Sequence, residues 1–333
     1  MVLRVLAQIA ELARALDLLR QLALQLLVEL CDFILELLQQ SRFQGSLVPE
    51  MLSELRIQSP QMERISSRQN PLVLRVRALA RGGARSDDEV VLDGEHLLRE
   101  ALASGVRIEA AAFAEEALSG RLADVAAAVE QSGGRAVAVT PAVLAALSPV
   151  RQPSGAVAIA RLARPDMEAV FNGTPAPLVF VLTDVQDPGN VGAIVRAGEA
   201  CGVTGIIAAE RTADAFGWKA LRGSMGSTFR VPVASRVRLQ DAADAAKQRG
   251  IRIAAAVPRG GDALPGVDLR PPSAILLGGE GSGLPDAIVR EADVRLSIPM
   301  RPPVESLNVA VAAALIAYEA ARQRAGDTRG SLR

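Results

Sequence analysis

The sequence predicts an α/β protein whose C-terminal half is a mostly parallel, doubly wound sheet. Short apolar segments alternate with helical segments between residues 178 and 322, which is typical of a parallel sheet covered by helices. Polar or glycine-rich corners follow three of these apolar segments, at residues 184–196, 278–284 and 298–308. Open α/β sheets bind their ligands at such corners, beyond the carboxyl ends of the strands.

The composition is that of a globular protein without a global charge. Half of the 333 residues are hydrophobic and the formal net charge is zero, so no overall field favours nucleic acid or membrane. At about 150 residues per domain, the chain has room for two domains. Nearly all cationic side chains are arginines, because Lys219 and Lys247 are the only lysines. Guanidinium groups suit bidentate phosphate recognition.

The scarcity of cysteine and histidine excludes several kinds of chemistry. Cys31 and Cys201 are the only cysteines, so we expect neither a disulfide framework nor a cysteine zinc site, and a cytoplasmic location fits. His96, the only histidine, lies in a predicted helix start and is interpreted as an ordinary first-turn residue. The reaction must therefore run without histidine or a bound transition metal; no metal is expected.

Residues 1–62 predict a helical extension and linker. Residues 1–40 form the helix, and an apolar seam with heptad spacing runs along it: Leu16, Leu19, Ala23, Leu26, Leu30, Phe33 and Leu37. The segment is an oligomerisation element or an extension from a misplaced start codon, since Met51 and Met62 offer later starts. Its longest uncharged run, residues 21–28, is far shorter than the ~20 apolar residues that span a bilayer, so no membrane is expected. A signal-peptide cleavage pattern is also lacking.

Residues 63–163 predict a smaller α/β domain. It begins with a segment that has no acidic residues between its arginines: Arg64, Arg68, Arg75, Arg77, Arg81 and Arg85. These arginines form either a solvated helix face or a patch that contacts phosphates. Strands are expected at 90–92, 108–113, 136–139 and 155–162, and helices at 96–102, 122–131 and 141–146. The domain carries no chemical motif.

Residues 164–177 are rich in proline and glycine and predict a linker to the domain at 178–326. The expected strands of that domain are 178–182, 205–208, 231–234, 252–256, 274–277 and 294–297. Helices fall between most of them. The last helix is expected at Leu307–Arg322.

The first corner, Asp184–Arg196, follows an apolar strand and leads into a helix that runs to about Ala200. Asn190 is placed in the loop and Arg196 on the second helical turn, both facing one crevice. The alternative is a plain strand–helix turn in which Asp187-Pro-Gly sets the turn geometry and Asn190 caps the helix.

The second corner, Gly278-Gly-Glu280-Gly-Ser-Gly283, has no lysine followed by serine or threonine, so it is not a phosphate loop. Its glycines permit close approach of a ligand to the backbone. Glu280 is its one charged residue and could bind a ribose hydroxyl or an arginine. In the third corner, Ser306 and Asn308 precede a helix of small apolar residues. They cap that helix, and its polar N-terminus points into an interior crevice.

Taken in order, these corners resemble the three motifs of the SpoU (TrmH-like) RNA ribose methyltransferases of the SPOUT superfamily. The blocks are Asn190 with Arg196, Gly278-Gly-Glu-Gly-x-Gly-Leu, and Ile298-Pro-Met with Ser306-Leu-Asn-Val. The segment Arg222-Gly-Ser-Met-Gly-Ser-Thr-Phe-Arg-Val-Pro also resembles the family, and residues 63–163 resemble its substrate-binding domain. Arg301-Pro-Pro303 departs from the family, which usually has a glycine there.

The resemblance implies S-adenosylmethionine as cofactor, RNA as substrate, a trefoil knot at about 270–320 and a homodimer whose active site draws on both subunits. By motif position, the cofactor would be bound by Leu277, Gly278, Ile298, Met300 and Leu307. The catalytic set would be Asn190, Arg196, Glu280, Ser306 and Asn308.

The reaction implied is methyl transfer from a sulfonium to a ribose 2′-hydroxyl. It requires alignment of the two partners and loss of the hydroxyl proton. A guanidinium stays protonated in proteins, so our hypothesis is that Arg196 binds the adjacent phosphate and acidifies the hydroxyl. Glu280 would orient Arg196, while Asn190, Ser306 and Asn308 position nucleotide and cofactor.

We favour 23S ribosomal RNA as the substrate, with a transfer RNA ribose methyltransferase as an alternative. An antibiotic-resistance methyltransferase acting on 23S ribosomal RNA is also compatible. Two rivals lie outside this chemistry: a non-catalytic RNA-binding protein of the same fold, and a dinucleotide-dependent oxidoreductase. The second would place its glycines at the first strand–helix turn of the sheet, whereas here they come near its end.

Overall fold

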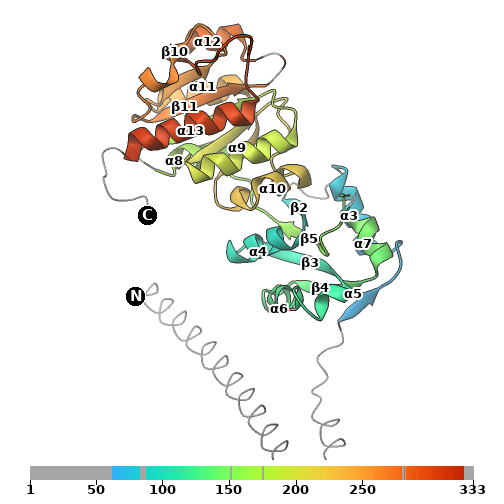
Figure 1. The fold of residues 1–333 in the computed structure, drawn as a ribbon. Helices are drawn as coiled ribbons and strands as arrows, with labels where there is room; N and C mark the ends of the chain where they lie inside the picture. Colours follow the sequence, from blue (N-terminus) through green and yellow to red (C-terminus); the bar gives the residue numbers. More distant parts are fainter. Residues whose placement is uncertain are drawn as a thin grey trace, which may run out of the picture. The chain divides into compact units, whose positions relative to one another are not determined.

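The computed structural model describes residues 62–82, 88–150, 152–174, 176–279, 281 and 283–325. The helical extension and linker expected at 1–62 lie outside these residues, apart from Met62. From Met62 onward the chain forms one compact unit with two sheets (Figure 1). None of the helices in the described part is long and apolar enough to cross a membrane.

The first sheet is five-stranded, mixed, and has the order β1-β4-β3-β5-β2. Its strands are β1 (Glu63–Ile65), β2 (Glu89–Asp93), β3 (Arg107–Ala114), β4 (Arg135–Val139) and β5 (Ala156–Arg161). Its helices are α3 (Pro71–Ala80), α4 (Glu95–Ala103), α5 (Glu115–Leu118), α6 (Ala123–Gln131) and α7 (Pro141–Leu147). The expected strands and helices are confirmed within a few residues, whereas β1, α3 and α5 were not assigned from the sequence.

The arginine-rich segment forms β1 and α3, and part of its charge is neutralised by the same domain. Arg75 donates to Glu109 at 2.5 Å and to Glu89 at 2.8 Å. Arg64 pairs with Glu115 at 2.7 Å. Arg77 and Arg81 are exposed. These contacts do not decide between the two expectations: Arg77 and Arg81 remain candidates for a phosphate-contacting surface, and Arg85 lies outside the described residues.

The second sheet has seven parallel strands in the order β10-β12-β9-β11-β6-β7-β8, which confirms the predicted class. The strands are β6 (Leu178–Thr183), β7 (Gly205–Ala209), β8 (Val233–Val237), β9 (Arg252–Ala256), β10 (Asp262–Ala263), β11 (Ser273–Gly278) and β12 (Val294–Ser297). The helices are α8 (Met167–Asn172), α9 (Pro188–Ala200), α10 (Trp218–Ser224), α11 (Leu239–Gln248), α12 (Asp286–Glu291) and α13 (Val309–Ala325). Only the two-residue strand β10 was missed among the strands.

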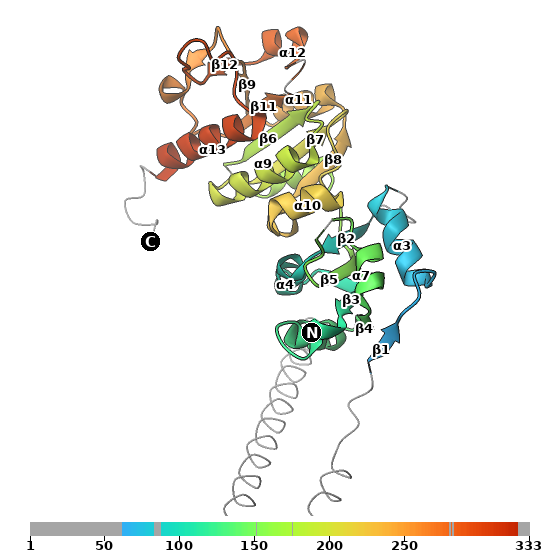
Figure 2. The same ribbon diagram turned by 45° about the vertical axis from the view of Figure 1, so that its right-hand side comes forward.

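Helices cover both faces of this sheet because its strands are apolar on both sides. In β6, Phe180 faces a core built with α9, α10 and α13, while its neighbours Val179 and Val181 face α8 and α11. All three side chains are fully buried. Figures 1 and 2 show α13 beside α9 on the first of these faces.

The segment expected to be a bare linker contains helix α8. Asp166 caps this helix by accepting a hydrogen bond from the Ala169 amide at 2.9 Å. Val170 and Phe171 are buried in the core that α8 shares with β6 and β7. Pro165 and Gly173 flank this short helix, and their presence favoured a linker in the sequence analysis although the helix packs onto the second sheet.

Two late strands enter the sheet between earlier ones. Strand β11 lies between β6 and β9, and β12 lies between β9 and β10. Beyond the paired ends of β6 and β11 the two chains stay side by side, since the Gly279 amide donates to the Thr183 carbonyl at 2.8 Å. This pairing positions the loops that form the candidate site.

Helix α13 is anchored at its C-terminal end by Arg324. Its guanidinium donates to the carbonyl groups of Leu269, Ala176, Pro177 and Pro271 at 2.9 to 3.3 Å. Pro177 precedes β6, and Pro271 lies just before β11. Burial lowers the pKa of Arg324 from its ordinary value. The helix end is thereby tied to the entry points of two central strands.

Candidate functional site

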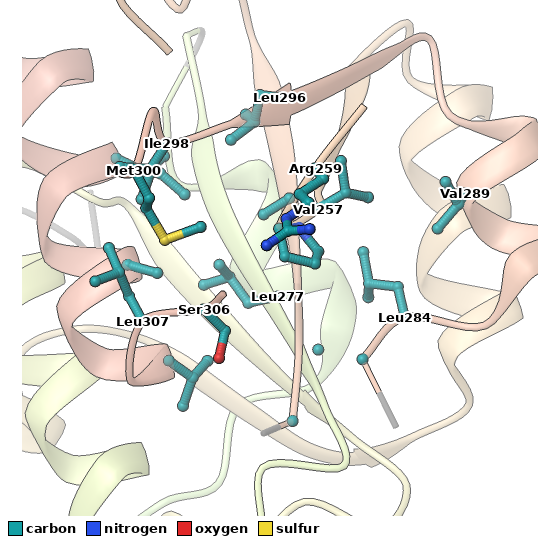
Figure 3. A pocket seen from close by; sticks show the side chains of 18 of the residues that line it. Val257, Arg259, Leu277, Leu284, Val289, Leu296, Ile298, Met300, Ser306 and Leu307 are labelled. Atoms are coloured by element: carbon teal, nitrogen blue, oxygen red, sulfur yellow. The ribbon is translucent and has the colours of Figure 1, made fainter. Parts of the chain in front are cut away.

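A cavity of about 490 Å³ lies beyond the carboxyl ends of β9, β11 and β12. This is the edge at which parallel sheets bind ligands. The cavity is mainly apolar: Leu277 and Leu296 form its floor, and both are almost fully buried. Figure 3 shows Ile298, Met300 and Leu307 on one side of it, with Leu284 and Val289 on the other.

The glycines of the second corner allow the chain to turn tightly at this cavity. A Cβ on Gly279 would lie 1.9 Å from the Asp184 carbonyl oxygen, and one on Gly278 would lie 2.3 Å from the Gly283 carbonyl carbon. Gly283 has a φ of +62°, a left-handed conformation that favours glycine. Close approach of backbone segments explains Gly278 and Gly279, and a left-handed backbone conformation explains Gly283. The resulting tight turn forms one wall of the cavity.

Every residue expected to bind the cofactor lines this one cavity. These residues are Leu277, Gly278, Ile298, Met300 and Leu307. Ser306, expected in the catalytic set, lines it too and has an exposed side chain. Residues from three separate segments of the sequence are thus brought to one place.

The first corner begins its helix earlier than expected. Asp187, not Asn190, caps α9: its carboxylate accepts from the Gly189 amide at 2.7 Å. Asn190 therefore lies within the first turn of the helix, and not in the loop. It lines a smaller cavity of about 260 Å³ that shares Gly281 and Val309 with the larger one. Because capping falls to Asp187, the Asn190 side chain is available for other contacts.

Asn308 joins the first and third corners. Its Oδ1 accepts from the amides of Ala310 at 2.9 Å and Val311 at 3.2 Å, which caps α13. Its Nδ2 donates to Asn190 Oδ1 at 3.1 Å. The capping role expected for Asn308 is thus confirmed, and it leaves the amide nitrogen directed at Asn190. This pair links the N-termini of α9 and α13 at the edge of both cavities.

Arg196 is not brought into this crevice within its own chain. It is six residues from Asn190 on α9, which is about 240° of rotation and about 9 Å along the axis. Its side chain is exposed and forms no ion pair with another residue that the structure describes. Glu280, the remaining member of the expected catalytic set, lies outside the described residues.

The sequence analysis missed part of the cavity wall. Val257, Pro258 and Arg259 follow β9 and line the cavity directly opposite the third corner's loop. Arg259 reaches Glu305 of that loop at 3.9 Å, and both side chains are exposed. The sequence did contain a signal for Arg259, because a polar residue just after the carboxyl end of a parallel strand is expected at the edge of the sheet where ligands bind.

An all-parallel sheet with late strand insertion and a cavity at its carboxyl edge define an α/β protein with a small-molecule site at that edge. The model of the SpoU rRNA Methylase family matches residues 177–318. An uncharacterized tRNA/rRNA methyltransferase of Synechocystis sp. is 34% identical over 80% of this chain and 96% of its own length. The chain belongs to the SpoU rRNA methylase family.

Other relatives agree with this assignment. The 23S rRNA (guanosine(2553)-2′-O)-methyltransferase RlmP of Bacillus subtilis is 29% identical over 68% of this chain and 86% of its own. A crystal structure of an AdoMet-bound rRNA methyltransferase from Sinorhizobium meliloti matches with a TM-score of 0.70 at 28% identity, covering 79% of this chain and 98% of that one. The SpoU methyltransferase AviRb from Streptomyces viridochromogenes, in complex with AdoMet, matches with a TM-score of 0.68 at 26% identity over 77% and 98%.

Proposed function

We propose that this protein transfers a methyl group from S-adenosylmethionine to a ribose 2′-hydroxyl of RNA, with 23S ribosomal RNA as the favoured substrate. The observation that carries the proposal is the Asn190–Asn308 pair beside two adjoining cavities. One cavity is large and apolar, and the other is smaller and polar. The activity that RlmP carries in its name supports both the reaction and the choice of RNA.

The larger cavity suits the cofactor in size and in lining. Its volume of about 490 Å³ falls within the ordinary range for small-molecule sites. Apolar side chains would contact the adenine, chiefly Leu277 and Met300, and the backbone of Gly278 has no side chain to block approach. Ile298 and Leu307 would complete the binding set. The complexes of two structural relatives with AdoMet support this use of the cavity.

When bound, the cofactor supplies an activated methyl group on a sulfonium. The residues of this chain must then align the ribose and assist loss of its proton. Ser306 and the Asn190–Asn308 pair would position the nucleotide and the cofactor, because they stand at the boundary of the two cavities. Arg196 would bind the adjacent phosphate and stabilise the developing alkoxide, with Glu280 orienting its guanidinium.

The position of Arg196 supports a homodimeric site. Since Arg196 faces about 120° away from Asn190 around α9, the two act on one ribose most simply if Arg196 serves a crevice of the partner subunit. An exposed apolar stripe on α13 supplies a surface for such a dimer. It consists of Val311, Leu315 and Tyr318, which are 42–65% exposed and spaced four and three residues apart.

Replacing Leu315 by glutamate should convert the dimer to a monomer and reduce turnover, because a charge would then be buried in the interface. Sedimentation velocity at micromolar protein concentration measures the first effect, and methyl incorporation measures the second. Leu74→Glu is the matched control for the sedimentation measurement, since Leu74 is similarly exposed but lies on α3. A Leu315→Glu protein that stays dimeric would contradict the interface.

Asn308 offers a way to separate helix capping from contact with Asn190. Asn308→Ser keeps a capping oxygen but is too short to reach Asn190, so the melting temperature should be preserved while turnover falls. Asn308→Ala removes both functions, and loss of the cap should cost about 1 kcal/mol of stability. Thermal unfolding and methyl transfer are measured for both variants. Full turnover in Asn308→Ser would show that the pair has no role in the reaction.

The strand order supports a trefoil knot in the C-terminal part of the chain. Strands β11 and β12 both enter between strands that precede them in the sequence, and the Gly279 backbone crosses against Asp184. The loops at residues 279–284 and 299–307 would be the crossing segments of the knot.

Residues 63–163 would form the domain that binds RNA, with Arg77 and Arg81 available to phosphates. A cytoplasmic location follows from an RNA substrate. Ribose methylation should be mapped in ribosomal and transfer RNA from cells with and without this gene. One 23S position that loses its methyl group supports the proposal, whereas loss from a transfer RNA alone favours the alternative substrate. Unchanged methylation in both RNAs, with no S-adenosylmethionine binding by calorimetry, would refute the activity.

A further inference from the structure

Helix α10 and the turn that follows it form the junction between the two sheets. Helix α10 packs against β2 of the first sheet and against α9 of the second (Figures 1 and 2). The segment 222–230 contains the end of α10, a left-handed turn at Met225 and Gly226, and a 3₁₀ turn at Ser227–Phe229. Its two arginines pair with different carboxylates of the first domain.

Arg222 is paired with a fully buried carboxylate of the first domain. Its Nη1 donates to Asp93 Oδ2 at 2.9 Å, and the Asp93 side chain has no exposed surface. The Ser148 hydroxyl donates to the other oxygen of Asp93 at 2.7 Å. Both carboxylate oxygens of Asp93 therefore accept hydrogen bonds, one from Ser148 of the same domain and one from Arg222 across the junction.

Arg230 forms a second bridge across the junction. Its Nη1 donates to Glu100 of α4 at 2.6 Å, while its Nε donates to Glu199 of α9 at 2.5 Å. These contacts raise the pKa of Arg230 and hold the pKa of Glu199 below its usual value. One guanidinium thus connects a helix of the first domain with the helix that carries Asn190 and Arg196.

The turn between the two arginines is fitted to the same surface. The φ of Gly226 is +93°, and a Cβ on it would lie 2.7 Å from Glu100 Cβ. His96 Nε2 lies 3.3 Å from the Met225 carbonyl oxygen. The first turn of α4 and its Glu100 therefore both contact this turn, at points separate from the Asp93 pair.

The backbone of α10 at the junction is in direct contact with α9, the helix that carries Asn190 and Arg196. A Cβ on Gly192 of α9 would lie 2.3 Å from the Ala220 carbonyl oxygen of α10. A Cβ on Gly223, next to Arg222, would lie 3.3 Å from the Gly189 carbonyl oxygen and 3.4 Å from the Gly192 Cα. Such backbone contact leaves no layer of flexible side chains, so a displacement of α10 is passed directly to the first half of α9.

We propose that Arg222 and Arg230 are positioning residues that hold the RNA-binding domain in a fixed register against α9 and thereby determine which ribose reaches the site. The inference rests on the proposed function. Paired charges add little net stability but fix geometry well, because their hydrogen bonds are directional. Two separated bridges resist rotation as well as translation of one domain on the other.

The test compares Glu100→Gln, Arg222→Gln and the double variant with wild type. Glu291→Gln is the matched control, since it breaks the ion pair with Lys247 inside the second domain. The substrate is ribosomal RNA from a strain that lacks the gene. Measured quantities are kcat, KM for RNA, the affinity for S-adenosylmethionine and the map of methylated riboses.

The double variant should raise KM for RNA by about tenfold or more, or methylate additional riboses, with cofactor affinity unchanged. Glu100→Gln should shift KM in the same direction, and the control should not. An unchanged KM and methylation map in the double variant would refute the proposal. If Arg222→Gln fails to fold, Glu100→Gln and Arg230→Lys decide the outcome, because both sites are partly exposed. Arg230→Lys should retain more activity than Arg230→Gln.

A second measurement keeps this test separate from that of the proposed function. Small-angle X-ray scattering reports on domain arrangement without RNA. The double variant should give a larger radius of gyration than wild type, and identical profiles count against the bridges. If the wild-type protein methylates no RNA but the double variant has a larger radius of gyration, the proposed function is refuted. The role of Arg222 and Arg230 in holding the two domains together is then still supported.

Discussion

Arg196→Lys should lower kcat for methyl transfer by about 10²–10³-fold while cofactor affinity stays unchanged. A lysine keeps the positive charge but loses the planar fork that binds two phosphate oxygens at once. Arg196 is exposed on α9 and its side chain has no ion pair among the described residues, so we expect no folding defect. Single-turnover methyl transfer with saturating RNA measures the chemical step.

The control is Arg238→Lys, which makes the same change at an exposed arginine paired with Asp241. It should not alter turnover. RNA affinity of Arg196→Lys is measured in parallel by filter binding. Unchanged turnover with intact RNA binding would exclude a bidentate role for Arg196, and equal loss of both would indicate that it serves binding alone.

Gly279→Ala should lower the free energy of unfolding by about 3 kcal/mol and weaken cofactor binding. The added methyl group would lie 1.9 Å from the Asp184 carbonyl oxygen, so the two crossing loops would have to move apart. The Gly279 amide would then lose its hydrogen bond to Thr183. Because these loops form the wall shared by both cavities, stability and cofactor affinity should fall together.

Gly266→Ala is the control for this variant. Gly266 lies in the same domain but lines neither cavity, and a Cβ on it would meet nothing within 4 Å. Denaturant unfolding and calorimetric titration with S-adenosylmethionine compare the two proteins. Equal stability of both variants would mean that the crossing can relax without cost.

The fold was largely predictable because apolar periodicity and turn residues are local. The strands at 252–256 and 294–297 were placed without error, and the other expected strands of the second sheet within three residues, since each is a short apolar run between polar turns. The missed elements lack that signal. Strand β1 has three residues, and only Ile65 is buried, so no alternation could reveal it. Helix α8 was masked by the prolines and glycine around it.

The site was predictable in composition but not in geometry. Motif order grouped six residues that all line the larger cavity: Leu277, Gly278, Ile298, Met300, Ser306 and Leu307. The sequence could not show that Asp187 would take the cap of α9, because Asp187 and Asn190 are both good capping residues. That choice moves Asn190 into the helix and turns Arg196 away from it. Ion pairs between distant residues, such as Arg222 with Asp93, leave no local pattern at all.

Helix α13 is tied down at both ends, and this restricts which parts of the site can move. Asn308 links its first turn to α9, and Arg324 links its last turn to the carbonyl groups before β6 and β11. A helix of 17 residues, about 25 Å long, cannot tilt with both ends held. Entry and release of a ligand should therefore involve the exposed loop at 299–307. In hydrogen exchange, the amides of that loop should open at low free energy while α13 exchanges only with global unfolding.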